Sequence, residues 1–218
     1  MNELALKRNP SLVSLIYEKL ENMILSGQLR SGDPVNERAL SMQFEVSRAP
    51  IREACRRLEQ AGLVSIIDNR GAFVREVSKT TATEVYDVAR LLSSEAARHA
   101  VANVTDEEVR KLTAMVEHIE RDANRDDLSS YYAHNDLFHL ELVKLGRNDK
   151  LAELYRSLNN ELTLYRQRGL RSFPDFERSL AAHRSIIEAL ARRDSAAYQQ
   201  ALDAHSTKMT ERLLNLGV

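Results

Sequence analysis

The sequence contains few of the features that mark secreted and membrane proteins. It has a single cysteine, Cys55, which excludes a disulfide within the chain, and it has no run of about 18 uncharged apolar residues that could span a membrane. The N-terminal segment MNELALKRNP lacks the apolar core of a signal peptide. We therefore expect a cytoplasmic protein that makes no contact with a membrane.

Proline and glycine are also scarce, with 4 and 7 residues, and the sequence has no proline-rich linker, repeat or low-complexity tract. The formal net charge is −1, so the overall charge gives no sign of a nucleic-acid partner. Any basic surface must therefore come from local clustering. At 218 residues the chain is long enough for two domains of the usual size, roughly 100 to 150 residues each.

The densest basic cluster of the first part lies in the segment VSRAPIREACRR, residues 46–57. Ser47 can cap a helix whose first turn holds Pro50. Along one ridge of this helix, three arginines recur at a spacing of four: Arg48, Arg52 and Arg56. The neighbouring stripe is apolar and includes Cys55, which we interpret as a core residue. Such a helix is typical of DNA recognition in the major groove, although a row of charges is also typical of a solvated surface.

The segments on either side of this helix favour the recognition role. Apolar residues at helical spacing predict helices at residues 11–27 and from Asn36 onward. A turn of about three residues joins the second of these helices to residues 46–57, as in a helix-turn-helix. Glu45 lies in that turn, where a left-handed backbone would cost a side chain about 1 kcal/mol. Past Gly62, the runs LVSII and AFVREV flank the turn DNRG and predict a β-hairpin.

Three helices followed by a hairpin predict a winged helix-turn-helix domain over residues 1–77. The tip of the hairpin then offers Asn69, Arg70 and Gly71 to a phosphate backbone or to a minor groove. This fold brings the row of arginines and the hairpin tip to one surface. The combination favours a DNA-binding surface over a merely solvated helix.

Residues 11–76 resemble the DNA-binding domain of GntR-type transcription regulators. The resemblance is carried by NERAL at 36–40, VSRAPIREA at 46–54 and NRGAFV at 69–74, which occur in the family's order and spacing. It implies DNA contacts from the second helix, the recognition helix and the wing: Arg38, Ser47, Arg48, Arg52, Arg70 and Gly71.

From Thr80 onward the sequence shows only helical periodicity, and we predict an all-α bundle of about six helices over residues 78–218. The predicted helices are 81–103, 105–125, 127–145, 148–168, 175–192 and 195–216. Capping residues such as Thr105, which is followed by three acidic residues, support these helix starts. The expected fold class is therefore mostly α, with the hairpin as a small β element.

Three of the predicted helices place a histidine in the middle of their buried face. These histidines are His139, His183 and His205, and Asn135 lies one helical turn before His139. A buried imidazole without a partner costs roughly 1 to 3 kcal/mol, so the three side chains should meet partners. A divalent metal of the zinc, nickel or manganese type would satisfy several of them at once. Alternatively, each imidazole is a core residue that bonds to a backbone carbonyl or to a tyrosine.

The same region resembles the FCD effector-binding domain of the FadR branch of the GntR family, through the segments NDLFHLELVKLGRN, AHRSIIEALARRD and ALDAHSTKMTERLL. It implies a metal site that helps to bind a carboxylate effector, with four ligands here: Asn135, His139, His183 and His205. Asn135 stands where the family has an Asp, and Asp136 is the alternative donor. Ala89 stands where the family often has an effector-binding Arg, and Arg90 is the candidate substitute.

These features predict a homodimeric transcription regulator that binds a palindromic operator in double-stranded DNA and responds to a small organic acid. The effector would change the relative placement of the two DNA-binding domains, a coupling typically worth about 1 to 3 kcal/mol. We predict no catalytic residues. Two alternatives stay open: a metal-dependent hydrolase or lyase built on the helical domain, and a regulator whose histidines bind the effector without a metal.

Overall fold

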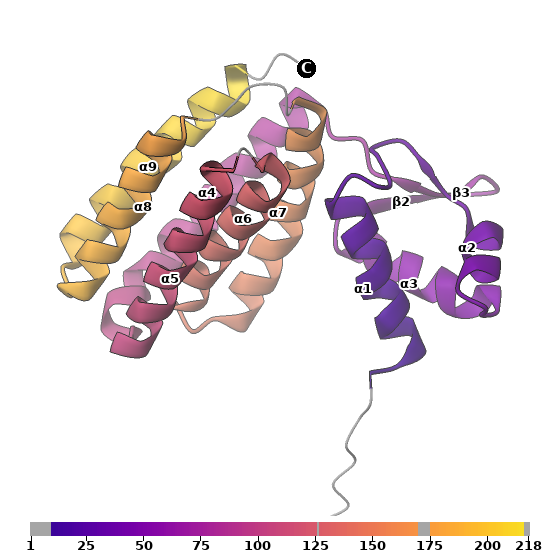
Figure 1. Cartoon of the computed structure of the whole chain (residues 1–218), viewed down its shortest axis with the longest axis horizontal. Helices are drawn as coiled ribbons and strands as arrows, with labels where there is room; N and C mark the ends of the chain where they lie inside the picture. Colours follow the sequence, from indigo (N-terminus) through magenta and orange to yellow (C-terminus); the bar gives the residue numbers. More distant parts are fainter. Residues whose placement is uncertain (1–9, 126, 170–174, 216–218) are drawn as a thin grey trace, which may run out of the picture. The chain divides into compact units, whose positions relative to one another are not determined.

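The computed structural model of the chain describes residues 10–125, 127–169 and 175–215. The chain forms two compact units, Met1–Glu76 and Val77–Val218 (Figure 1). The predicted fold class is confirmed, because the described part is mostly helical and contains a small antiparallel sheet of three strands.

The helices of the first unit begin and end at residues suited to those positions. They are α1 (Leu12–Leu25), α2 (Glu37–Gln43) and α3 (Arg48–Gln60). The Asn36 side chain accepts a hydrogen bond from the backbone N–H of Ala39 and so caps α2. Gly27 follows α1 with a φ of 77°, which glycine adopts without steric cost. Glu45, in the turn between α2 and α3, has a φ of 55° and is the left-handed residue that the spacing suggests.

The core of the first unit is formed mainly by α1 and α3, which pack against each other, while α3 also contacts α2 and the sheet. The largest fully buried side chains are apolar: Leu20, Ile24, Ile51, Leu58 and Leu63. Cys55 lies in this core with 1% of its surface exposed. Burial, with a smaller contribution from the charge of Glu37, raises the pKa of its thiol to about 11. The thiol is therefore protonated at neutral pH and acts as a small apolar residue.

The sheet of the first unit has the strand order β1-β3-β2, and all neighbouring strands are antiparallel. β2 (Val64–Ile67) and β3 (Gly71–Val74) form the predicted hairpin, in which Ile67 pairs with Gly71. A third strand, β1 (Pro34–Val35), is absent from the sequence-based prediction. It pairs with the other edge of β3 and makes the wing a three-stranded sheet.

The second unit is helical along its described part. Its helices are α4 (Lys79–Asn103), α5 (Asp106–Ala123), α6 (Leu128–Lys144), α7 (Asp149–Gly169), α8 (Phe176–Ala191) and α9 (Ser195–Asn215). Their order matches the prediction, and their bounds differ from it by no more than two residues. Thr105 and Glu108 form a capping box at the start of α5, since each side chain accepts a hydrogen bond from the other's backbone N–H.

These helices form a bundle around one main apolar core. Helix α4 packs against α6, α7 and α9, while α5 packs against α6 and α8, and α8 packs against α9. The core includes large side chains from four helices, α5, α6, α8 and α9, and small ones from α4: Leu112, Ile119, Phe138, Ile186, Leu190, Tyr198, Ala97 and Ala100. The histidine-bearing faces of α6, α8 and α9 turn toward this interior.

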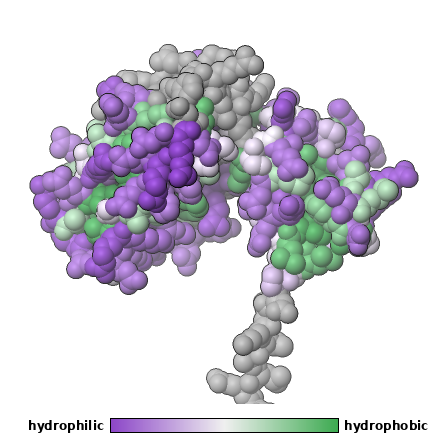
Figure 2. All heavy atoms as spheres, viewed as in Figure 1, coloured by the Kyte–Doolittle hydropathy of each residue, from purple (hydrophilic) through white to green (hydrophobic). Residues whose placement is uncertain are grey.

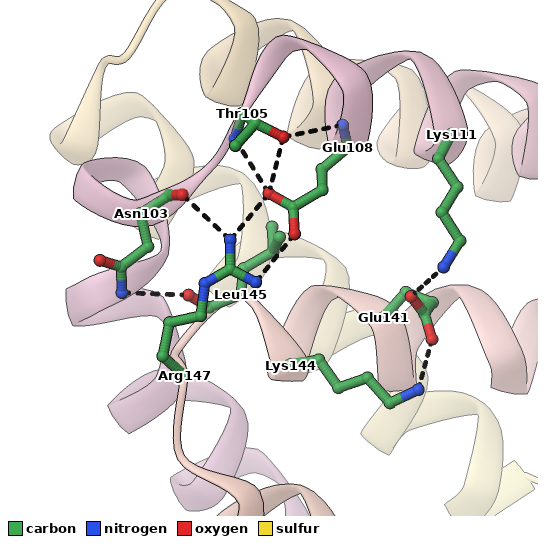
Figure 3. A network of polar contacts seen from close by, with 8 residues as sticks. All are labelled: Asn103, Thr105, Glu108, Lys111, Glu141, Lys144, Leu145 and Arg147. Atoms are coloured by element: carbon green, nitrogen blue, oxygen red, sulfur yellow. Dashed lines mark hydrogen bonds and ion pairs between the residues drawn. The ribbon is translucent and has the colours of Figure 1, made fainter.

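A polar network fixes one end of the bundle (Figure 3). Arg147, in the loop after α6, donates hydrogen bonds to both carboxylate oxygens of Glu108 at 2.8 and 2.9 Å, and to the carbonyl of Asn103 at 3.1 Å. The side chain of Asn103 in turn donates to the carbonyl of Leu145 at 3.2 Å. The network therefore holds the start of α5 and the end of α4 against the end of α6.

The side drawn in Figure 2 is largely hydrophilic, with apolar areas on both units. Leu12 and Leu15, in the first turn of α1, are large apolar side chains that are about half exposed. Among the described helices, none combines the length and the apolar character that crossing a membrane requires.

Candidate functional site

One face of α3 is a row of exposed arginines. Arg48, Arg52 and Arg56 all have exposed side chains, with 61% of the Arg52 side chain and 70% of the Arg56 side chain accessible. The opposite face is buried in the core: Ile51, Ala54, Cys55 and Leu58. The helix thus buries one side and presents guanidinium groups from the other, as the sequence predicts.

The first turn of α3 has an uncommitted hydroxyl group. Ser47 occupies the capping position, but its side chain makes no capping hydrogen bond. The physical reason is Pro50, which stands three residues later and has no N–H for the serine to accept. Ser47 is exposed, so its hydroxyl can bind a phosphate oxygen at a helix N-terminus, where the helix dipole favours negative charge.

A hydrogen-bonded ion pair links the two helices of the helix-turn-helix. Arg52 donates from Nε to a carboxylate oxygen of Glu37 in α2 at 2.7 Å, and this bond uses neither of the terminal nitrogens of the guanidinium. Arg38 is exposed on α2, next to Glu37. Arg48 makes no ion pair within the described part of the chain, so its charge is fully available to a ligand.

The tip of the wing has a backbone conformation that few residues adopt. Asn69 has a φ of 59° and Gly71 a φ of 95°, and the intervening Arg70 is exposed. A side chain on Gly71 would meet no neighbouring atom, so the glycine is required by its backbone angle alone. The guanidinium of Arg70 lies 5.5 Å from the centre of the Phe73 ring, a cation–π contact that orients it at the tip.

The second unit brings its three predicted histidines together. His139 from α6, His183 from α8 and His205 from α9 each offer a ring nitrogen, and these nitrogens all lie within 4.8 Å of one another. The Nε2 atoms of His139 and His205 are 3.2 Å apart. The ring centres are 4.9 to 5.2 Å apart in all three pairs. Three residues spread over the sequence from 139 to 205 therefore form one cluster.

His183 and His205 of the cluster are buried and His139 is partly buried, and the imidazoles of His139 and His183 are held in the neutral form. Burial, followed by the proximity of His205, lowers the pKa of both His139 and His183 well below the usual value. His183 is completely buried, and neither of its ring nitrogens has a hydrogen-bond partner. Neutral imidazole is the form that ligates metals. The alternative in which each histidine bonds to a carbonyl or a tyrosine does not describe His183.

An oxygen donor lies on the same helix as His139. Asn135 is 2% exposed, and its side-chain oxygen has no hydrogen-bond partner. Because Asn135 precedes His139 by four residues, both side chains lie on one face of α6. Three neutral nitrogens and a neutral oxygen form a donor set that suits a divalent transition metal. The residues present therefore fit such an ion.

A buried arginine next to this cluster was missed by the sequence-based prediction. Arg166 of α7 is 7% exposed, and its Nη2 donates to Oδ2 of Asp136 at 2.6 Å and to the hydroxyl of Thr163 at 2.9 Å. Its positive charge also contributes to the low pKa of His139. Its guanidinium lies 5.6 Å from the centre of the Tyr132 ring. Asp136, the alternative metal donor, is thus engaged by an arginine.

The candidate effector residue Arg90 has a different setting. Its side chain is exposed on α4, whereas the neighbouring Ala89 is buried with 3% of its surface exposed. The structure therefore places the buried guanidinium on α7, at Arg166, and not on α4. Tyr86 of α4 faces the same region: burial raises its pKa to about 12, and the charges of Arg166 and Arg90 partly offset this increase.

The remaining histidines lie outside the cluster. His134 of α6 contacts the carboxylate of Asp122 at 2.6 Å, and its ring centre is 5.9 Å from that of His118. His99 and His118 are exposed. These positions provide matched controls for substitutions within the cluster.

Two families of known sequences match this chain, one in each unit. Residues 12–74 match the gntR family of bacterial regulatory proteins. Residues 84–208, which are more than half of the chain, match the FCD domain. The two matches together cover the winged helix-turn-helix and the helical bundle described above.

Individual relatives match large parts of the chain. The HTH-type transcriptional regulator YdhC of Bacillus subtilis is 29% identical over 198 residues, which are 90% of this chain and 88% of the relative. The Nta operon transcriptional regulator of Aminobacter aminovorans is 30% identical over 145 residues, 66% of this chain and 68% of the relative. The solved structure of McbR/YncC from E. coli has the same fold, with a TM-score of 0.83 at 20% identity, over 93% of this chain and 97% of that one.

Proposed function

The chain is a transcriptional regulator of the GntR family with an FCD domain, and from this premise we propose that it binds an operator as a homodimer and responds to a small organic acid. The observation that carries the proposal is the occurrence, in one chain, of an exposed arginine row on α3 and a buried cluster of three histidines in the bundle. The first suits DNA, and the second suits a metal that binds a carboxylate. We expect the protein to act in the cytoplasm.

The proposed DNA contacts come from three places in the first unit: Arg38, Ser47, Arg48, Arg52, Asn69, Arg70 and Gly71. The arginines at the start of α3 are the candidates for base contacts, because an arginine fork matches the two acceptors of a guanine in the major groove. Ser47 and the tip of the wing are candidates for phosphate and minor-groove contacts. Two copies of the chain would read two half-sites of a palindromic operator.

The proposed metal ligands are Asn135, His139, His183 and His205. When bound, a zinc, nickel or manganese ion would act as a Lewis acid that attracts the carboxylate of the effector. The packing of α6, α8 and α9 would hold these donor atoms close enough together to bind one ion. In the enzymatic alternative a carboxylate would have to act as general base, and Asp136 is instead held by Arg166.

DNA binding is tested by fluorescence anisotropy with a labelled duplex from the region upstream of the protein's own gene. A scrambled duplex of equal composition is the control, and both are measured near physiological salt. We expect the upstream duplex to bind tighter by about 10³-fold or more, as specific sites do. Equal affinity for both duplexes would contradict sequence-specific regulation through this site.

The metal site is tested by elemental analysis of the purified protein and of two variants. We expect about one divalent ion per chain in the wild type and a large loss in His183→Ala, because removing one of three nitrogens weakens the site strongly. His118→Ala, an exposed histidine of the same unit, is the control and should keep the ion. An unchanged ion content in His183→Ala would rule out the proposed ligands.

A further inference from the structure

The ion pair between Arg166 and Asp136 lies within the interior of the bundle. The Asp136 oxygen that accepts a hydrogen bond from Arg166 also accepts one from the Thr163 hydroxyl at 2.7 Å. One carboxylate oxygen of α6 is therefore bonded to two side chains of α7. The side chains of Asp136 and Arg166 are 12% and 9% exposed. This pair is therefore more deeply buried than the other ion pairs of the described residues, whose arginine and lysine side chains are at least 39% exposed.

Each member of this ion pair retains one buried atom without a partner. The second oxygen of Asp136, Oδ1, accepts no hydrogen bond, and the Nε–H of Arg166 donates none. One atom is an acceptor and the other is a donor, and they belong to groups that already touch each other at 2.6 Å. Buried polar groups in folded proteins are nearly always paired, so two such atoms on one ion pair indicate a site for a polar ligand.

The chemistry of a matching ligand follows from these two atoms. It must accept a hydrogen bond from the Nε–H of Arg166 and donate one to Oδ1 of Asp136. A simple carboxylate supplies acceptors alone, and its charge would face the negative oxygen of Asp136. A 2-hydroxy carboxylate supplies both functions on adjacent atoms, because its carboxylate accepts while its hydroxyl donates.

We propose that Arg166 and Asp136 form the part of the effector site that selects a 2-hydroxy carboxylate over the corresponding acid without the hydroxyl group. The inference rests on the proposed function, since it names the class of acid that the regulator senses. Three further observations support the position. The guanidinium of Arg166 lies 5.6 Å from the centre of the Tyr132 ring. Its charge also acts to lower the pKa of Tyr86 and of Tyr155, so aromatic side chains lie close to the pair. The charge of Arg166 also acts to lower the pKa of His139 in the histidine cluster.

Amino acids fit this site less well than hydroxy acids. An ammonium group could donate to Asp136, but it would bring a positive charge next to Arg166 and next to a cluster that suits a divalent cation. A hydroxyl group donates the same hydrogen bond without that charge. The expected order of affinity is therefore hydroxy acid first, followed by the amino acid and by the unsubstituted acid.

The test uses calorimetric titration of the full-length, metal-loaded protein with matched pairs of acids. The pairs are lactate with propionate, malate with succinate, and gluconate with 2-deoxygluconate, and alanine is added for comparison with lactate. For the pair of the size that the site accepts, we expect the hydroxy acid to bind at least about tenfold tighter, since a site built to bond a hydroxyl rejects the analogue that lacks it. Equal affinity within every pair, or no binding of any acid, would overturn the inference.

A double variant assigns the selectivity to these residues. Asp136→Asn combined with Arg166→Gln keeps hydrogen-bonding groups of similar shape in place of the charges, which favours folding. We expect the affinity of the double variant for the preferred hydroxy acid to fall by about tenfold or more. Its preference for the hydroxy acid over the matched acid should also disappear. The matched control replaces an exposed pair of the same unit, Glu120→Gln with Arg184→Gln, whose side chains are 2.8 Å apart. Wild-type selectivity in the Asp136/Arg166 variant would contradict the assignment.

Operator binding and metal content, measured on the same samples, separate this inference from the proposed function. A wild-type protein that binds its operator duplex and its metal but shows no preference within the pairs overturns only the role of Arg166 and Asp136. A wild-type protein that binds neither overturns the proposed function itself. If the double variant does not fold, equal affinities of the wild type within the matched pairs would still overturn the inference.

Discussion

At the scale of single residues, Glu108 is a group whose charge matters for stability. The guanidinium of Arg147, together with two hydrogen bonds from Thr105, holds the pKa of Glu108 at about 2, although burial acts in the opposite direction. The pKa is lower in the folded state than the ordinary value of 4.5. The stabilisation is therefore fully present above about pH 4.5 and is lost as the pH falls toward 2.

We predict that Glu108→Gln lowers the free energy of unfolding by about 1 kcal/mol at pH 7, a modest value because both partners are partly exposed to water. Glutamine can still complete the capping box, so the variant removes mainly the charge. The difference in the free energy of unfolding between the wild type and the variant should shrink as the pH approaches 2. Urea unfolding at several pH values measures this difference. Glu107→Gln, in the same helical turn, is the control and should have little effect. A difference that stays constant between pH 7 and pH 2 would contradict this account.

Residues with a local role could be predicted from the sequence, and residues defined by distant partners could not. Asn36 and Glu45 have the cap and the left-handed angle that their positions predict, because both depend on neighbours within three residues. The hydroxyl of Ser47 is free because Pro50 removes the expected donor. Arg166 is one of two arginines near the end of α7. Its burial depends on Asp136, 30 residues earlier, which periodicity does not reveal.

At the scale of elements, a glycine sets how closely two segments of the bundle approach. A Cβ atom on Gly146 would lie 2.9 Å from the Cα atom and 3.1 Å from the carbonyl oxygen of Ala96 in α4. Both are backbone atoms and cannot rotate away. The turn after α6 can therefore contact α4 closely only with glycine at this position.

We predict that Gly146→Ala destabilises the protein by about 1 to 3 kcal/mol, the usual cost of forcing an extra methyl group into a packed interface. Thermal unfolding followed by circular dichroism measures the change. Gly27→Ala is an instructive comparison, because a side chain there meets no atom and only the φ of 77° is strained. A Gly146→Ala variant as stable as the wild type would mean that α4 and the turn can move apart at no cost.

The histidine cluster joins three helices, so a bound metal should stabilise their packing. We predict that adding Ni²⁺ or Zn²⁺ to the metal-free protein raises its melting temperature, because an ion at about 100 times its dissociation constant contributes about 2.7 kcal/mol. His139→Ala should lose this increase, since its ring nitrogens lie within the cluster. His99→Ala, exposed on α4, should keep it. An equal increase in both variants would show that the ion binds elsewhere.

Elements with their own periodicity were predictable, whereas an element stabilised only by its neighbours was not. The six helices of the bundle carry apolar residues at helical spacing and clear caps, and their bounds could be placed within two residues. β1 consists of two residues and has no pattern of its own. It is a strand only because β3 offers an unpaired edge, a tertiary effect that the local sequence does not encode.

At the scale of the whole molecule, the sequence indicated two parts with different chemistry. The motifs of the first 77 residues predicted a DNA-binding part. The histidines on the buried faces of three later helices predicted a ligand-sensing part. The matches to the gntR family and to the FCD domain fall on the two compact units. The ligand class could not be derived from spacing, because it depends on which polar atoms of distant helices stay unpaired in the fold.

We propose that the arginines of α3 read DNA, and the double variant Arg48→Ala with Arg52→Ala tests this most directly through its affinity for the upstream duplex. The loss of two base contacts, at about 1 to 3 kcal/mol each, predicts binding weaker by at least about 30-fold in fluorescence anisotropy. The control, Arg98→Ala with Arg192→Ala, removes two exposed arginines of the helical unit and should bind like the wild type. If the α3 variant binds as tightly as this control, the arginine row is not the DNA-reading surface.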